Sequence, residues 1–180
     1  MKWALSANSW RLFTAALLAL VLDQGSKGWL LAHPLPEGGA RTFSFFGKSL
    51  SLIPTENLTL VFGLLADWPN AAQTAFLVFA GLLLLVVALA FFHSLGPGEG
   101  ANAVALGLLL GGGMGNLMDW GFHGAFIEIA HFRGFDASSS SNFNVADMCI
   151  GAGIVLLMVE LLVAEGASRA GEHPSTHRDA

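Results

Sequence analysis

The stretch NFNVADMCIGAGIVLLMVELL, residues 142–162, has the character of a membrane-spanning helix with a carboxylate, Asp147, near its start. A charged side chain at the depth of the bilayer costs at least ~2.5 kcal/mol on insertion scales, so such groups usually face protein or a water-filled cavity. The stretch therefore predicts both a membrane helix and a candidate functional site near the start of that helix.

The composition supports a membrane protein. Of the 180 residues, 54% are hydrophobic and only 12% are charged, whereas a soluble domain carries roughly 25% charge. The net charge of -5, with no basic stripe, excludes a nucleic-acid partner. The single cysteine, Cys149, lies in an apolar run and cannot form an internal disulfide; we read it as a small buried hydrophobe.

Four apolar segments approach the ~20 residues that a helix needs to cross the hydrocarbon core. We predict an all-α membrane protein with four transmembrane helices at about 12–31, 71–92, 101–118 and 145–163. These helices form a single polytopic domain, residues 1–165, and residues 166–180 form a disordered polar tail. Lysine and arginine divide four against four between the two sides, so charge leaves the orientation open.

Two further features predict local structure. The first loop alternates polar and apolar residues from Ser49 to Leu52 and from Asn57 to Val61, which predicts a small β-rich region at the membrane surface between helices 1 and 2. In the third segment Gly107, Gly111 and Gly115 recur every four residues, forming a smooth stripe for close helix packing. No strand precedes this glycine cluster, which argues against a nucleotide-binding loop.

Carboxylates gather at one predicted membrane face. Four crossings of alternating direction bring Asp23, Asp119 and Asp147 together, and Glu128 follows Asp119 by nine residues in the same loop. Two carboxylates in one site hold a single proton between them, so one activates water while the other polarises a carbonyl. This is aspartic-protease chemistry and needs no metal or cofactor. From spacing alone, helix caps or an ion path remain open alternatives.

Sequence blocks in four places sharpen this prediction. They are LDQGSK (22–27), ENLTLVFGLL (56–65), GGGMGNLMDW (111–120) and FNVADMCI (143–150). Their order is that of the lipoprotein signal peptidase, or signal peptidase II, family, and the chain resembles this family from the first segment through the fourth. FNVADMCI fits the family pattern FNxADxxI, and GGGMGNLMD fits GGxxGNxxD; these two blocks are the more specific ones.

The resemblance implies an intramembrane aspartic endopeptidase that cuts prolipoproteins before a diacylglyceryl-modified cysteine. It also implies a bacterial inner-membrane location, with both termini in the cytoplasm and the active site and β-rich loop near the outer face. The expected partners are these substrates and membrane lipids, and we expect a monomer. Asp147 is then one catalytic aspartate, and Asp119 is an accessory one. The family's motifs assign the polar pocket to Asp23, Asn57, Asn116 and Asn144, with Lys27 beside it.

The chain departs from the family at three places. Glu128 occupies the position of the second catalytic aspartate, and Trp120 replaces the arginine that follows GNxxD. Thr59, Leu60 and Val61 stand where small residues are usual. Glutamate has nearly the acidity of aspartate, but its extra methylene moves the carboxylate by on the order of 1 Å, and such a displacement can cost ~100-fold in rate. We predict that Glu128 is the catalytic partner of Asp147.

Two other functions fit parts of the pattern. The first is a catalytically impaired paralogue that binds lipopeptides or sequesters an inhibitor of the true enzyme, which Glu128 and Trp120 would favour. The second is a small transporter or channel with a carboxylate relay. A metal site is disfavoured, because the spacing of His123, Glu128 and His131 matches no standard zinc motif.

Overall fold

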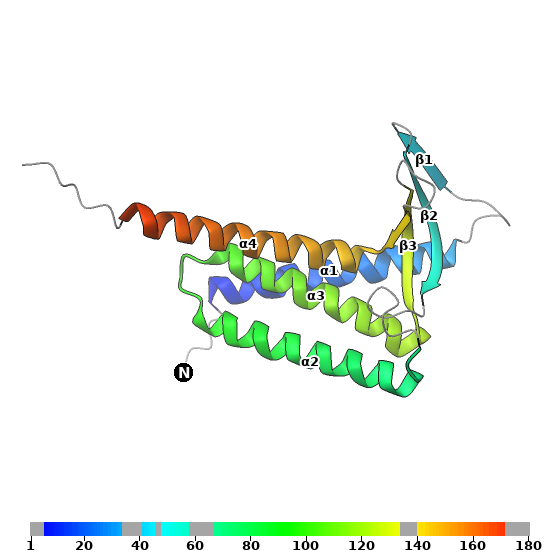
Figure 1. Ribbon diagram of the computed structural model, residues 1–180, viewed down its shortest axis with the longest axis horizontal. Helices are drawn as coiled ribbons and strands as arrows, with labels where there is room; N and C mark the ends of the chain where they lie inside the picture. The colour runs from blue at the N-terminus through cyan, green and yellow to red at the C-terminus, as the bar shows by residue number, and fades with distance from the viewer. Residues whose placement is uncertain (1–5, 34–40, 46–47, 58–66, 134–139, 172–180) are drawn as a thin grey trace, which may run out of the picture.

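The computed structural model describes residues 6–33, 41–45, 48–57, 67–133 and 140–171. Four long helices run side by side, and a small sheet stands across one end of them (Figure 1). The helices are α1 (Ala7–Ala32), α2 (Asn70–Ser94), α3 (Gly100–His123) and α4 (Val145–Gly171). The strands are β1 (Arg41–Phe45), β2 (Lys48–Asn57), β3 (Phe126–Arg133) and β4 (Ser140–Phe143).

Each helix contains one of the predicted apolar segments and extends beyond it at one or both ends. The clearest case is α4, which continues to Gly171, so residues 166–171 of the predicted disordered tail are helical. An exposed ion pair between Glu165 and Arg169, one helical turn apart, supports this extension. The remainder of the predicted tail, residues 172–180, lies outside the described residues.

The protein is predominantly helical, and α2, α3 and α4 are long and apolar enough to cross a membrane. Within the described residues α1 does not meet the same standard of hydropathy, because its sequence includes Arg11, Asp23 and Lys27. Its buried residues nevertheless recur at three- and four-residue spacing, which places them on one face of the helix. The opposite face is exposed and apolar, with Phe13 and Leu17 among its residues.

The helix α3 forms the centre of the bundle, and its glycines determine how closely its neighbours approach. The predicted stripe is confirmed: a Cβ on Gly107 or Gly111 would collide with backbone atoms of α1. On another side of α3, a Cβ on Gly112 would lie 2.6 Å from the carbonyl oxygen of Ala146 in α4. Because a glycine surface lets two backbones approach closely, α3 packs tightly against both α1 and α4.

The sheet is antiparallel with the strand order β1-β2-β3-β4. The predicted alternation from Ser49 to Leu52 lies in β2, where Leu50 and Leu52 pack against a buried cluster of Leu30, Ile127, Ile129 and Ala130. Strands β3 and β4, which come from the loop between α3 and α4, were not predicted from the sequence. The second predicted alternation falls mainly in residues 58–66, outside the described residues. A shift of register between Leu52 and Thr55 brings Thr55 opposite Glu128.

The packing of α1 against α3 generates a first prediction. Replacing Gly111 with alanine places a methyl group against the backbone of Ala16, which cannot rotate away, so the two helices must separate. Overpacking of this kind costs about 1–3 kcal/mol. We expect Gly111→Ala to lower the thermal midpoint of unfolding in detergent, followed by tryptophan fluorescence.

The matched control is Gly25→Ala in α1, where an added Cβ meets no atom within 4 Å. Alanine has the higher helix propensity, so this variant should leave the midpoint unchanged or raise it. Equal losses in the two variants would contradict the assigned packing role of Gly111.

Candidate active site

The predicted site residues lie where the last turns of α1 and α3, the first turn of α4 and the sheet come together (Figure 1). They form two groups with different surroundings. One is a buried group of charges, here called the ionic cluster, which consists of Asp23, Lys27 and Asp119. The other group lines a cavity of about 620 Å³, here called the site cavity, and consists of Asn57, Asn116, Glu128, Asn144 and Asp147.

The ionic cluster is organised around one ammonium group. Lys27 Nζ donates hydrogen bonds to Asp23 Oδ2 and to Asp119 Oδ2, both at 2.6 Å. The side chains of Lys27, Asp23 and Asp119 are only 3%, 0% and 1% exposed. Charges this deeply buried are tolerated only when they are paired and their remaining oxygens also find donors.

Those further donors come from α4, from β3 and from α1 itself. The backbone N–H of Ala146 donates to Asp23 Oδ1 at 2.8 Å, and that of Ile127 donates to Asp119 Oδ2 at 3.1 Å. The amide of Gln24 donates to Asp119 Oδ1 at 2.9 Å. The cluster thereby joins α1, α3, the start of β3 and the first turn of α4. The sequence analysis did not assign a role to Gln24, although it lies inside the LDQGSK block.

Asp147 is held by a reciprocal arrangement at the start of α4. Its backbone N–H donates to Asn144 Oδ1 at 2.8 Å, while its Oδ2 accepts from the backbone N–H of Asn144 at 3.2 Å. This is the capping-box pattern, with the two residues three positions apart. Asn116 of α3 donates to Asp147 Oδ1 at 2.9 Å, and its own oxygen accepts from the Asn144 amide at 3.1 Å. Both carboxylate oxygens of Asp147 are therefore fixed in position.

Glu128 reaches the same cavity from the sheet. On β3 its neighbours Ile127 and Ile129 pack into the buried cluster beside Leu30. Because successive side chains of a strand point to opposite faces, Glu128 lies on the face opposite Ile127 and Ile129. The amide of Asn57, on β2, donates to Glu128 Oε1 at 2.6 Å. Glu128 is only 8% exposed, whereas Asp147 is an exposed residue.

The site cavity combines two carboxylates with a largely apolar wall. Asp147 and Glu128 both line it, and so do the three asparagines that bond to them or to one another. The wall is completed by α2, with Phe76 and Leu77, and by α4, with Ile150 and Ile154. These apolar wall residues were not predicted as part of the site. A pair of carboxylates in such a cavity suits general acid–base chemistry on a bound water and an extended apolar substrate.

Trp120 lies behind the cavity wall. Its indole Nε1 donates to Thr74 Oγ1 at 3.0 Å, and its ring lies 5.5 Å from that of Phe126, which lines the cavity. The residue thus ties the last turn of α3 to the first turns of α2. The other departures from the family pattern, Thr59, Leu60 and Val61, lie outside the described residues.

The described residues include no group of three histidine, cysteine or carboxylate side chains that could hold a metal ion. Of the two histidines considered for such a site, His131 instead bonds through Nε2 to Thr55 Oγ1 at 3.0 Å. His123 is exposed near the end of α3. The polar side chains described above that line the site cavity are carboxylates and amides.

The ionic cluster yields a stability prediction. Lys27→Met leaves Asp23 and Asp119 buried beside each other without their shared cation, and breaking a buried pair in this way costs about 3–5 kcal/mol. We expect a large fall in the thermal midpoint in detergent. Arg169→Met, which removes the cation of an exposed pair at the same helical spacing, is the control and should change the midpoint little. Similar midpoints for the two variants would contradict the structural role of Lys27.

Comparison with known proteins places the chain in a family. Residues 15–163 match the family described as Signal peptidase (SPase) II. The lipoprotein signal peptidase of Sphingopyxis alaskensis is 32% identical over 164 residues, covering 89% of this chain and 90% of that protein. The lipoprotein signal peptidase of Syntrophomonas wolfei is 31% identical over 153 residues, covering 85% and 93%.

The fold is also known. A solved structure described as a bacterial membrane enzyme superimposes with a TM-score of 0.70 at 19% identity, covering 93% of this chain and 94% of that one. A second structure of the same description gives a TM-score of 0.66 at 22% identity. The family model matches this chain over most of its length, and the two relatives named above are more than 30% identical to it. The chain therefore belongs to the signal peptidase II family.

Proposed function

We propose that this chain is a prolipoprotein signal peptidase that hydrolyses the peptide bond before a diacylglyceryl-modified cysteine, with Asp147 and Glu128 as its catalytic pair. The observation that carries the proposal is that both carboxylates line one cavity, each with an asparagine amide bonded to an oxygen. Membership of an aspartic-protease family that processes lipoproteins supports the same reaction.

The reaction follows from two carboxylates that share one proton. The ionised carboxylate takes a proton from a water molecule, whose oxygen attacks the carbonyl carbon, while the protonated carboxyl gives its proton to the carbonyl oxygen. The tetrahedral intermediate then collapses: the carboxyl that took the proton from water gives it to the leaving nitrogen, the C–N bond breaks, and the hydroxyl formed from the carbonyl returns its proton to the other carboxylate. The bonds from Asn116 and Asn57 keep the two carboxylates oriented through these steps.

Glutamate at position 128 is compatible with this scheme. Its side chain starts from a strand and is directed into the cavity by the opposite burial of Ile127 and Ile129. Asn57 lies within hydrogen-bonding distance of the longer side chain, at 2.6 Å. We therefore propose that the site is built around a glutamate, so the catalytically impaired alternative is not favoured.

We propose that α1 is a fourth membrane crossing. Its two charges nearest the sheet, Asp23 and Lys27, neutralise each other inside the protein, and its outer face is apolar. A buried ion pair adds no charge to the lipid-facing surface, so hydropathy alone underestimates this helix. The active site then lies at the outer face of the bacterial inner membrane, in a monomer surrounded by membrane lipids.

The test is cleavage of a diacylglyceryl prolipoprotein by purified protein in detergent, followed by mass spectrometry. Wild type should cut, and Asp147→Asn and Glu128→Gln should each lose about 100-fold or more, the usual range for a lost general acid or base. Glu128→Asp withdraws the carboxylate by on the order of 1 Å and should lose up to about 100-fold. Glu160→Gln, in α4 but outside the site cavity, is the control and should retain full activity.

Two outcomes of this experiment would contradict the proposed function. An inactive wild type together with an active Glu128→Asp variant would identify a disarmed relative, whose function is to bind lipopeptides. Activity that survives both amide substitutions would remove Asp147 and Glu128 from the reaction.

A further inference from the structure

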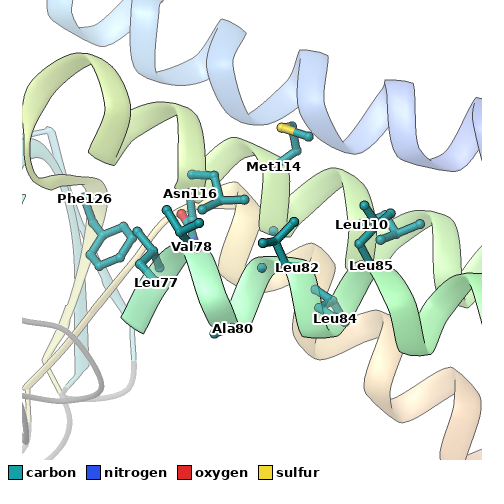
Figure 2. Close-up of a pocket in the computed structure, with 13 residues that line it drawn as sticks. Leu77, Val78, Ala80, Leu82, Leu84, Leu85, Leu110, Met114, Asn116 and Phe126 are labelled. Atoms are coloured by element: carbon teal, nitrogen blue, oxygen red, sulfur yellow. The ribbon is translucent and has the colours of Figure 1, made fainter. Parts of the chain in front are cut away.

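A second cavity lies between α2 and α3, next to the site cavity. It has a volume of about 470 Å³ and is here called the α2–α3 cleft (Figure 2). Leucine side chains of both helices surround it, among them Leu82, Leu85 and Leu110. Of the described residues that line it, only Asn116 has a polar side chain. No step of the proposed reaction uses this cleft.

Contacts near both of its ends hold α2 against the bundle. Near its start, Thr74 accepts a hydrogen bond from Trp120. Near its end, Ala88 is buried with Leu12 and Leu106 in a hydrophobic cluster. Between these contacts the described residues of α2 are all exposed or only half-buried. In the middle of the helix α2 meets α3 where a leucine faces a glycine, Leu117 over Gly81 and Leu84 over Gly113, and the cleft lies beside these contacts.

Two glycines lie where α2 and α3 approach each other beside the cleft. A Cβ on Gly81 would lie 3.0 Å from Leu117 Cδ1, and one on Gly113 would lie 3.2 Å from Leu84 Cδ2. Both glycines also line the cleft, beside the leucines that pack against them. Larger residues at these positions would fill part of the space.

The lining determines what kind of molecule the cleft would hold. Water or a polar ligand needs several hydrogen-bond partners, and among the described lining residues the amide of Asn116 is the only polar side chain. Leu82 lines the cleft and is 58% exposed on a helix that faces lipid, so the cleft is open toward the hydrocarbon. The chemistry that fits is an unbranched acyl chain.

The position of the cleft indicates where such a chain would come from. Leu77, Ala80, Asn116 and Phe126 line both the cleft and the site cavity. Asn116 also bonds to Asp147, which places the cleft beside the proposed catalytic group. The proposed substrate carries its lipid on the residue that follows the scissile bond, so its acyl chains must leave the site close to these shared residues.

We propose that the α2–α3 cleft is a subsite for one acyl chain of the substrate's diacylglyceryl group; this inference rests on the proposed function. The acyl chain is surrounded by apolar groups before and after it binds, so no large transfer from water is involved. What the cleft contributes is therefore the position of the substrate. A chain seated in the cleft fixes the modified cysteine, and with it the peptide bond, relative to Asp147 and Glu128. The cleft therefore makes cleavage depend on acyl-chain length.

The experiment uses the neighbouring leucines Leu82, which lines the cleft, and Leu83, which does not and is 51% exposed. Leu82→Trp and Leu83→Trp are compared with wild type on dipalmitoylglyceryl and dioctanoylglyceryl forms of one prolipoprotein peptide, and kcat/KM is measured for each. Gly113→Leu fills the cleft from α3 as an independent variant, and thermal midpoints verify that all variants are folded.

Wild type should prefer the dipalmitoyl substrate. Leu82→Trp and Gly113→Leu should lower kcat/KM for this substrate on the order of tenfold, less than the ~100-fold of a misplaced reacting group, and leave the dioctanoyl substrate almost unaffected. Leu83→Trp should change neither value. Equal losses on both substrates, or equal effects of the two leucine variants, would overturn the subsite. So would a loss of the chain-length preference when phospholipid is added, since bulk lipid would then be the occupant.

Failure of the proposed function gives a different pattern. If wild type cuts neither peptide, dissociation constants are measured for both with the scissile amide reduced to an amine. A weaker affinity of Leu82→Trp for the dipalmitoyl form alone would retain the cleft as a lipid-binding site without catalysis. Equal affinities of wild type and Leu82→Trp for that form would remove the subsite as well.

Discussion

The buried ammonium of Lys27 is the contact on which the rest of the site depends. It bonds to Asp23 of its own helix and to Asp119 of α3, and backbone N–H groups of β3 and α4 complete the coordination of these carboxylates. Every side-chain nitrogen or oxygen that is buried in the described parts of the chain has a partner. In an apolar environment each bond of this network is strong, and each missing partner is costly. The cluster therefore fixes four chain segments in one arrangement before any substrate binds.

The carboxylates at the sheet end of the helix bundle have two kinds of hydrogen-bond partner. Asp23 and Asp119 are fully committed to Lys27 and their other donors, and neither lines the site cavity. Asp147 and Glu128 instead accept hydrogen bonds from neutral amides and face the cavity. A carboxylate that lines the cavity can contact a bound substrate, whereas one enclosed in the ionic cluster cannot. The local partners thus separate the groups that hold the site together from those suited to chemistry.

Much of this arrangement could be predicted from the sequence, because membrane helices leave clear patterns. The apolar segments lie inside the observed helices, the glycine stripe marks the contact with α1, and the FNVADMCI and GNLMD blocks identify the family. Strands β3 and β4 were missed, since short strands in a loop give weak signals. The alternation in FIEIAHFR could have revealed β3. The pairing of β3 with β2, which brings Asn57 to Glu128, depends on contacts between residues 71 positions apart and is not visible in local patterns.

The loose packing of α2 follows from the tight packing elsewhere. Glycines let α1 and α4 approach the backbone of α3, so these three helices and the sheet form a rigid unit. Along α2 only Gln73 and Ala88 are buried, and the hydrogen bond from Trp120 to Thr74 secures its first turns. A peptidase that receives its substrate from the lipid phase needs one wall that admits apolar chains without disturbing its carboxylates. Because α2 contributes no charged group to the ionic cluster, the bonds that join α1, α3, β3 and α4 do not depend on how the middle of α2 packs.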